Sequence, residues 1–354
     1  MSDRIEANLA ETFRQPPPAY RSVPFWSLND VLEPAEIDRQ LEAFGRGGYG
    51  GAYLHSRIGL LTEYLGPGWW AAMDAGVRAC ERLGLECWFY DEDLWPSGFA
   101  GGKVPLMSEE YHSRSLLRVP KEDPVPENSR VLREDERFRY VCRKVRMGNP
   151  RFNGTCWVDL LNPDTVRAFI DCSYRPYVER YRESIGTVVK GIFTDEPQVS
   201  PKPESPCAGS VPFSPGIPEA FREQHGYDIL DHLASLFEDV GDWARVRVDY
   251  FRTVARCFEE SFTRQIAGYC QETGLVLTGH YNGENAFRSV QMNVGNMMAH
   301  YRHMQRPGVD YLGLHFGEDQ CIHIIRSLSS VANQYGRRRR LSEMFGISGQ
   351  NMNF

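Results

Sequence analysis

The 354-residue sequence predicts an α/β fold, a (β/α)8 barrel of the TIM type whose last βα unit is missing from this chain. Short β-like runs alternate with helical patterns along nearly the whole sequence, as in a parallel sheet with crossover helices. An open doubly wound sheet is the alternative, but no glycine-rich phosphate loop follows any strand. The glycine-rich stretch at 45–51 precedes a strand, so it is a helix-to-strand connection.

Seven β-like runs supply the predicted strands, and helical patterns lie between them. The runs cover residues 23–28, 50–56, 85–91, 187–195, 275–281, 309–315 and 339–345. Apolar residues at helical spacing predict helices from Pro34 and over 69–83. Further helices are expected from 162, with Asn162 as the N-cap, and over 242–273.

The stretch at about 104–160 is too long for an ordinary connecting loop. Its alternating pattern, clearest at 137–145, predicts a β-hairpin inserted after the third strand. The chain has no internal repeat and no low-complexity linker. Residues 1–354 are therefore expected to form a single TIM-barrel-like domain that carries this insertion.

The composition is that of a soluble globular protein, with 42% hydrophobic and 25% charged residues. The net charge of −7 argues against a nucleic-acid partner, and no apolar stretch is long enough to span a membrane. The first residues lack the apolar core of a signal peptide, and the nine scattered cysteines are typical of reduced thiols. We therefore expect a cytoplasmic protein, while the sequence leaves its oligomeric state open.

Polar or aromatic side chains close all seven runs, at the barrel end where chemistry occurs in this fold. They are Trp26 and Asn29; His55, Ser56 and Arg57; Asp91, Glu92, Asp93 and Trp95; Asp195 and Glu196; His280 and Tyr281; His315; and Glu343. This concentration predicts one site that the strand ends share.

Glu196 and Glu343 are the predicted catalytic pair. Each stands at the end of a β run that would otherwise bury it, and Pro197 favours an extended backbone at Glu196. Glycoside cleavage needs one carboxylic acid to protonate the leaving oxygen and a second carboxylate to activate water or attack the sugar. Strands four and seven lie on opposite sides of a barrel mouth, so the two side chains are expected to face each other across a sugar.

The other strand-end residues are predicted to bind the substrate. Aromatic side chains are expected to stack on a sugar ring, and polar ones to bind its hydroxyl groups. The aromatic set is Trp26, Trp95 and Tyr281, and the polar set is His55, Arg57, Asp91, Glu92, Asp195, His280 and His315. No cofactor is required, although the acidic residues 91–93 are candidates for holding Ca²⁺ or for binding hydroxyls.

Other catalytic chemistries have weaker support. The stretches WPSG (95–98) and FGISG (345–349) are not GxSxG elbows, which disfavours a serine hydrolase. His300 and His303 have no obvious third ligand, and neither do Cys321 and His323, which disfavours a zinc site.

The sequence resembles glycoside hydrolase family 106, the α-L-rhamnosidases, and their uncharacterised relatives. The matching stretches follow the same order through nearly the whole chain: PFWSLND (24–30), GGAYLHSRIGLLTEYL (50–65), WFYDEDLWPSGFAGG (88–102), VDLLNP (158–163), GIFTDEP (191–197), LTGHY (277–281) and SEMFG (342–346). The resemblance implies that Glu196 is the general acid and Glu343 the general base of an inverting reaction. It also implies calcium near the sugar, held by residues 91–93 or the histidines.

Known family members are longer and carry further β-rich domains, and rhamnose specificity does not carry over to the wider group. A barrel without its eighth strand exposes two edge strands, so a partner or a missing segment is expected to complete it. Two alternatives stay open. One is a retaining glycosidase with Glu343 as the nucleophile, and the other is a non-catalytic carbohydrate-binding barrel. The carboxylate separation distinguishes retaining (about 5–5.5 Å) from inverting (about 6.5–9.5 Å) enzymes.

Overall fold

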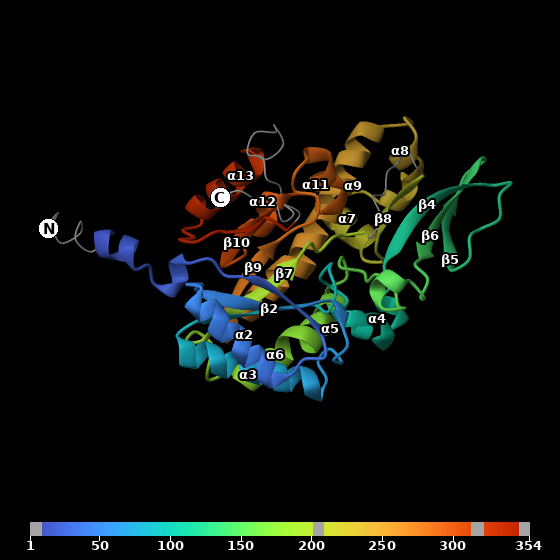
Figure 1. Cartoon of the computed structure of the whole chain (residues 1–354). Helices are drawn as coiled ribbons and strands as arrows, with labels where there is room; N and C mark the ends of the chain where they lie inside the picture. The colour runs from blue at the N-terminus through green and yellow to red at the C-terminus, as the bar shows by residue number, and fades with distance from the viewer. Residues whose placement is uncertain (1–8, 201–208, 313–321, 347–354) are drawn as a thin grey trace. The chain divides into compact units, whose positions relative to one another are not determined.

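The computed structural model describes residues 9–200, 209–312 and 322–346 (Figure 1). The fold is mixed α/β, with one seven-stranded and one four-stranded sheet. The chain divides into two compact units that alternate along the sequence. Unit 1 comprises Met1–Trp95, Tyr177–Phe193 and Cys270–Val276; unit 2 comprises Pro96–Pro176, Thr194–Tyr269 and Leu277–Phe354. The expected single domain over 1–354 stays a prediction.

The seven-stranded sheet has the strand order of a partial barrel. Its strands follow chain order, β1-β2-β3-β7-β9-β10-β11, without the reversal of a doubly wound sheet. They are β1 (Phe25–Asp30), β2 (Gly51–Leu60), β3 (Glu86–Tyr90), β7 (Val189–Asp195), β9 (Val276–His280), β10 (Arg306–Tyr311) and β11 (Leu341–Met344). All seven predicted runs overlap a strand, and within the described residues no eighth strand joins them. A parallel partial barrel is thus present, whereas a closed (β/α)8 barrel is not shown.

Unit 1 packs two helices beside its strands, as the sequence predicts. They are α2 (Pro34–Arg46) and α3 (Pro67–Leu83). Proline stands in the first turn of each, where its missing N–H costs nothing, and Gly84 ends α3 in the left-handed conformation. The side chain of Leu54 on β2 packs so closely on Gly76 of α3 that an added Cβ would lie 2.5 Å from it.

Unit 2 carries most of the remaining helices, and two of the long ones contain a π-helical turn. Between residue 96 and the last described residue, the α-helices are α4 (Lys103–Met107), α5 (Pro163–Phe169), α6 (Arg175–Tyr181), α7 (Ile217–His225), α8 (Leu233–Phe237), α9 (Trp243–Phe258), α10 (Gln265–Thr273), α11 (Phe287–Asn293), α12 (Met297–Tyr301) and α13 (Ile322–Gln334), as far as the structure describes the chain. The π turns are η5 (Ile170–Tyr174) and η8 (Glu259–Arg264), and the short 3₁₀ turns are η1 (Pro18–Tyr20), η2 (Ala100–Gly102), η3 (Glu109–Tyr111), η4 (Pro150–Phe152) and η7 (Ile229–Asp231). The predicted cap is confirmed, because the Asn162 side chain accepts a hydrogen bond of 2.9 Å from the Asp164 N–H.

The inserted segment forms more than the predicted hairpin. Its strands β4 (Arg114–Pro120), β5 (Ser129–Glu134) and β6 (Phe138–Lys144) pair antiparallel, side by side in Figure 1. A fourth strand, β8 (Ser210–Phe213), completes the order β5-β6-β4-β8. The sequence predicts a loop at β8 because the stretch is rich in proline. An edge strand tolerates Pro212, however, and Val211 and Phe213 are buried.

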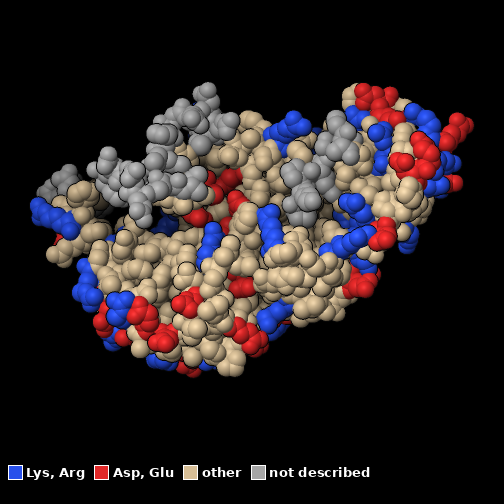
Figure 2. All heavy atoms as spheres, turned by 45° about the vertical axis from the view of Figure 1, so that its right-hand side comes forward, with Lys and Arg blue, Asp and Glu red and all other residues tan. Residues whose placement is uncertain are grey.

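The helices and the charged side chains of the surface bear on what a membrane or a nucleic acid would require. None of the helices that the structure describes is long and apolar enough to cross a membrane. On the face shown in Figure 2, Lys and Arg side chains are interspersed with Asp and Glu.

Candidate active site

The ends of β7, β9, β10 and β11 gather acidic and basic side chains within unit 2. β7 ends at Asp195, which Glu196 follows, and β9 ends at His280. Asp310 lies on β10 and Glu343 on β11. Polar atoms of Asp195, His280 and Glu343 lie within 4.8 Å of one another, and so do those of Glu196, His280 and Asp310. The two predicted catalytic glutamates therefore belong to one cluster, with His280 common to both groups.

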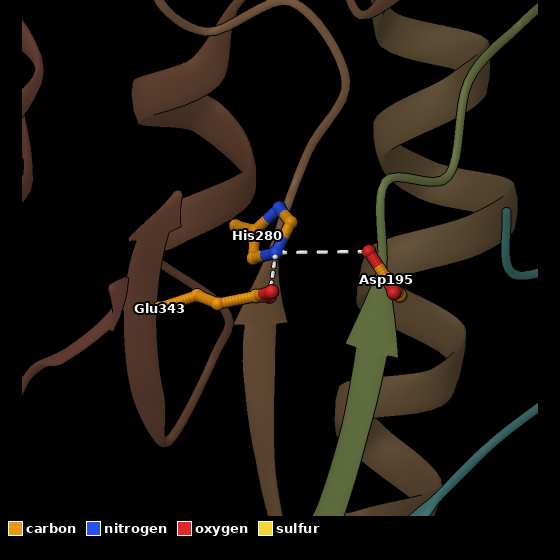
Figure 3. A group of neighbouring side chains, drawn as sticks. All are labelled: Asp195, His280 and Glu343. Atoms are coloured by element: carbon orange, nitrogen blue, oxygen red, sulfur yellow. Dashed lines mark hydrogen bonds and ion pairs between the residues drawn. The ribbon is translucent and has the colours of Figure 1, made fainter. Parts of the chain in front are cut away.

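His280 is the cation of this cluster. Its Nε2 atom lies 2.8 Å from Glu343 Oε2 and 3.6 Å from Asp195 Oδ1 (Figure 3). Burial disfavours a charged ring at 1% exposure, but the carboxylates of Glu343 and Asp195 outweigh it and hold the pKa of His280 well above its usual range. The ring is therefore an imidazolium at neutral pH, and its N–H donates to Glu343.

Asp310 places a third carboxyl group beside the predicted pair. It is the register partner of Glu343 on the neighbouring parallel strand, so both side chains lie on the same face of the sheet. Burial, together with the charges of Glu343 and Glu196, raises the pKa of Asp310 to about 7, against the lowering effect of His280. Asp310 thus exchanges a proton near neutral pH.

Glu284 is a buried carboxyl group behind the cluster. Tyr301 donates its hydroxyl proton to Glu284 Oε2 at 2.7 Å, and the backbone N–H of Asp310 donates to Oε1. Burial at 5% exposure raises the pKa of Glu284 to about 8, against the lowering effect of His280 and of both hydrogen bonds. Glu284 is therefore neutral at pH 7, and it fixes the position of the β10 backbone at Asp310.

Glu196 has a strained backbone, which corrects the expected extended conformation. Its φ is 48°, in the left-handed region that residues other than glycine rarely adopt, although Pro197 follows it. The Glu196 N–H donates to the carbonyl of His280 at 3.2 Å, and Asn282 Nδ2 lies 3.4 Å from Glu196 Oε2. The bond to the end of β9 holds this conformation. Strain of this kind is concentrated at functional sites.

Asp195 is fixed by reciprocal hydrogen bonds with Ser97. The backbone N–H of Asp195 donates to Ser97 Oγ at 2.7 Å, and the Ser97 N–H donates to the Asp195 carbonyl at 2.8 Å. Asp195 is buried at 4% exposure, with its carboxylate toward His280. Asp195 therefore lies in the cluster, as predicted, where its carboxylate faces the imidazolium of His280. Its predicted contact with a sugar stays a prediction.

Close backbone contact between β7 and β9 sets the spacing of the cluster. Gly279, just before His280, has a φ of 121°, and a Cβ atom there would lie 1.9 Å from the carbonyl oxygen of Thr194. Only glycine fits this position. The absence of a side chain therefore brings the end of β9 against the residues preceding Glu196.

Tyr281 does not present its ring to a ligand, in contrast to the expected stacking role. It is fully buried, and its ring packs against His300 and Phe258. Thr263, in the π turn η8, hydrogen-bonds to both the Tyr281 hydroxyl and His300 Nδ1. Tyr281 thus anchors the chain after His280 to the long α9–η8–α10 helix, which is a structural role.

Trp26, in unit 1, also differs from its predicted orientation. Its indole N–H donates to Gln40 on α2 at 3.1 Å, and its ring packs edge-on against Phe44 of the same helix. Phe25 has the alternate position on β1 and packs on Tyr53 and His55 of the neighbouring strand. Trp26 therefore faces the helix, because the two faces of a strand alternate.

His55 is a buried neutral residue of unit 1. Its ring stacks on Phe25 and contacts Tyr90, each at a centroid distance of 4.1 Å. Burial and then the charge of Arg57 hold the pKa of His55 well below its usual range. Arg57 Nη1 lies 3.4 Å from His55 Nε2.

The acidic residues after β3 are buried or half-buried within unit 1. Asp91 and Glu92 are fully buried, and Trp95 is half-buried. Glu92 Oε1 accepts the N–H of Asp93, and Ser56 Oγ donates to Asp93 Oδ1 at 2.8 Å. These contacts hold the turn after β3. The remaining predicted residue, His315, lies outside the described residues.

Oxygen ligands for a hard cation occur together at the cluster of unit 2. Among the described residues, the cluster forms two groups of three mutually close ligand atoms, each including one of the histidines that the sequence also indicated, whereas 91–93 form none. A calcium site stays a prediction. Asp195, Glu196, Asp310 and Glu343 offer the carboxylates that Ca²⁺ prefers. Protonated His280, common to both groups, would repel a cation, so a bound cation and the proton of His280 are alternatives.

Comparison with known proteins finds a solved structure with the same fold, but no related sequence. No family model and no curated protein matches the sequence. Among solved structures, a rhamnosidase from Novosphingobium sp. PP1Y aligns with a TM-score of 0.66 and 14% identity over 94% of this chain. The two proteins share a fold. The chain spans 52% of that rhamnosidase, and the low identity limits the likeness to the fold.

A second solved structure adds nothing to this assignment. A morphinone reductase in complex with tetrahydroNAD aligns over 91% of this chain and 82% of its own length, with 13% identity. Its TM-score of 0.29 carries no argument.

The cluster brings both predicted glutamates next to other ionisable groups. Glu343 is hydrogen-bonded to His280, and Glu196 stands beside Asp310, a carboxyl group with a pKa of about 7. The sequence prediction missed Glu284 and Asp310. Asp310 could have been predicted, because an aspartate inside the apolar run at 309–315 is unusual in a buried strand. Glu284 could not, because it lies in the loop after β9, where a glutamate is usually exposed to solvent.

Proposed function

We propose that this chain is a glycoside hydrolase that cleaves a terminal, α-L-rhamnoside-like glycosidic bond with Glu196 as general acid and Glu343 as general base. The observation that carries the proposal is the hydrogen bond of 2.8 Å between the buried His280 imidazolium and Glu343. It ties one glutamate at the end of a parallel strand to His280, which also lies close to Glu196 at the end of another strand. The fold shared with a rhamnosidase is consistent with this chemistry.

In the proposed reaction Glu343 removes a proton from water as that water attacks the anomeric carbon. The glycosidic C–O bond breaks, and Glu196 gives its proton to the leaving oxygen. Asp310 supports this role, because it places a second carboxyl group that exchanges a proton near neutral pH beside Glu196. The alternative is a retaining reaction in which Glu343 attacks the sugar directly.

Substrate binding is proposed for the polar strand-end residues. His55, Arg57, Asp91, Glu92, Trp95, Asp195, His280 and His315 keep this assignment as a proposal. Trp26 and Tyr281 are left out, since their rings pack against a helix and in the interior, respectively. A calcium ion, if used, would bind the carboxylates of the cluster and orient sugar hydroxyls there.

Hydrolysis of a panel of aryl glycosides, α-L-rhamnoside first, tests the proposal. Glu196→Gln and Glu343→Gln should each lower turnover about 10²–10⁴-fold, while sugar binding survives. Glu219→Gln, an exposed substitution on α7, is the matched control and should leave turnover unchanged. Normal turnover in both active-site variants would exclude acid–base catalysis by this pair, and binding without hydrolysis of any glycoside would indicate a carbohydrate-binding barrel.

The leaving group separates the two roles. A dinitrophenyl glycoside needs little proton donation, so it should restore the activity of Glu196→Gln and leave Glu343→Gln inactive. Proton NMR of the first-formed sugar then distinguishes inversion from retention. Retention would assign Glu343 as the nucleophile.

A further inference from the structure

A basic groove runs along the surface between α9, α11 and α12 of unit 2. It encloses about 940 Å³, and its walls carry five arginines and no lysine. A second hollow of about 910 Å³ lies against the same helix, toward α7. Arg252 and Arg256 line both hollows, one helical turn apart on α9. These two arginines therefore form a ridge between adjoining depressions.

The positive charge of this groove is only partly neutralised. Arg302 is ion-paired with Glu259, and Arg247 with Asp239 at 3.0 Å. Arg256 has one contact of 3.4 Å with Glu260. For Arg252 and Arg288, both exposed, the described residues provide no ion pair or hydrogen bond. In a protein of net charge −7, this is a local excess of available guanidinium groups.

Apolar side chains lie among the arginines. Phe251 and Met292 line the groove, and so does Val248, which is 49% exposed. Arginine, methionine and aromatic residues are enriched in protein–protein interfaces, whereas lysine is depleted. This lining matches an interface for a polypeptide better than a surface for a polyphosphate, which would need a broad basic field.

We propose that the groove binds an acidic amphipathic helix of a partner protein. Carboxylates one turn apart on that helix would match the spacing of Arg252 and Arg256, about 6 Å along α9. Its neighbouring apolar stripe would contact Phe251 and Met292. The ligand chemistry follows from the groove alone, so the inference does not rest on the proposed glycosidase activity.

Fluorescence anisotropy with a labelled helical peptide tests this directly. The probe carries Glu at i and i+4 and Leu at i+3 and i+7, and a second peptide has Gln in place of every Glu. The whole chain should bind the first peptide, with affinity falling as salt rises. The double variant Arg252→Gln/Arg256→Gln should bind at least about tenfold more weakly, because two charge-assisted hydrogen bonds are lost.

Arg326→Gln is the matched control, since Arg326 is an exposed arginine on α13, outside the groove. It should bind the peptide as tightly as the unchanged chain does. Equal binding by the double variant, or equal binding of the Gln peptide, would overturn the proposal. Tighter binding of a polygalacturonate oligomer than of the peptide would also overturn it, in favour of an anionic glycan. Because binding is measured directly, a failure to hydrolyse glycosides leaves the outcome unaffected.

Discussion

Replacing Glu284 by glutamine is expected to make the protein less sensitive to alkaline pH. Glutamine can keep both contacts of the neutral carboxyl group, because its oxygen can accept from the Asp310 N–H and its amide can donate to the Tyr301 oxygen, which reverses the direction of that hydrogen bond. The substitution keeps the shape of the side chain and removes its ability to ionise. At acidic pH the two proteins should therefore have similar free energies of unfolding.

The magnitude follows from the pKa of Glu284, which rises from its ordinary 4.5 in the unfolded chain to about 8 in the fold. Between these values the folded state binds the proton more tightly, so the free energy of unfolding falls as pH rises. The stabilisation that protonated Glu284 contributes to the fold is fully present below pH 4.5 and is lost as the pH rises to about 8 and beyond. A difference of about 3.5 between the two pKa values corresponds to at most about 5 kcal/mol.

Urea unfolding of both proteins at several values between about pH 5 and about pH 9 measures this effect. The variant should gain stability relative to the unchanged chain as pH rises. Glu219→Gln, at an exposed glutamate, should run parallel to the unchanged chain. A difference between Glu284→Gln and the unchanged chain that does not vary with pH would show that Glu284 ionises normally in the folded protein.

Two further predictions concern the same strand ends. Asp310→Asn removes a carboxyl group with a pKa of about 7 beside Glu196, so the kcat/KM–pH profile should change shape near pH 7; an unchanged profile would show that Asp310 takes no part in the proton exchange. Gly279→Ala should destabilise the fold by more than about 3 kcal/mol in thermal unfolding, because its Cβ would collide with the carbonyl of Thr194. Gly268→Ala is its control, since this helical position has open space and alanine should stabilise it by up to about 1 kcal/mol; similar effects of the two substitutions would refute the close-contact argument.

The strands and the cluster at their ends were predictable from the sequence. Seven apolar runs, each ending in polar residues, identify parallel strands because a buried strand can expose polar groups only at its ends. Chain order then places Glu196 just after β7, His280 at the end of the adjacent strand β9, and Glu343 on β11, two strands beyond β9. The order and the common direction of the strands are enough to predict that these residues lie at the same edge of the sheet. Side-chain packing need not be known for this.

Orientation and protonation were not predictable in the same way. Trp26 and Phe25 differ by one position on β1, and the sequence does not show which of them faces the helix. Tyr281 follows the strand end like a ligand-binding residue but turns inward, toward Thr263 on a distant helix. The left-handed φ of Glu196 arises from contacts with β9 that override the preference imposed by the following proline.

The fourth strand of the small sheet has a consequence for how this architecture can change. β8 belongs to a segment about 90 residues beyond β4, on the far side of β7 in the sequence, yet it pairs with β4. The four-stranded sheet is thus built from two separate segments of the chain, and deleting the insertion after β3 alone would remove only part of it. Removing the insertion would leave β8 without its partner strand β4. A protein that lost the insertion would therefore also need changes in the segment between Glu196, the proposed acid, and β8.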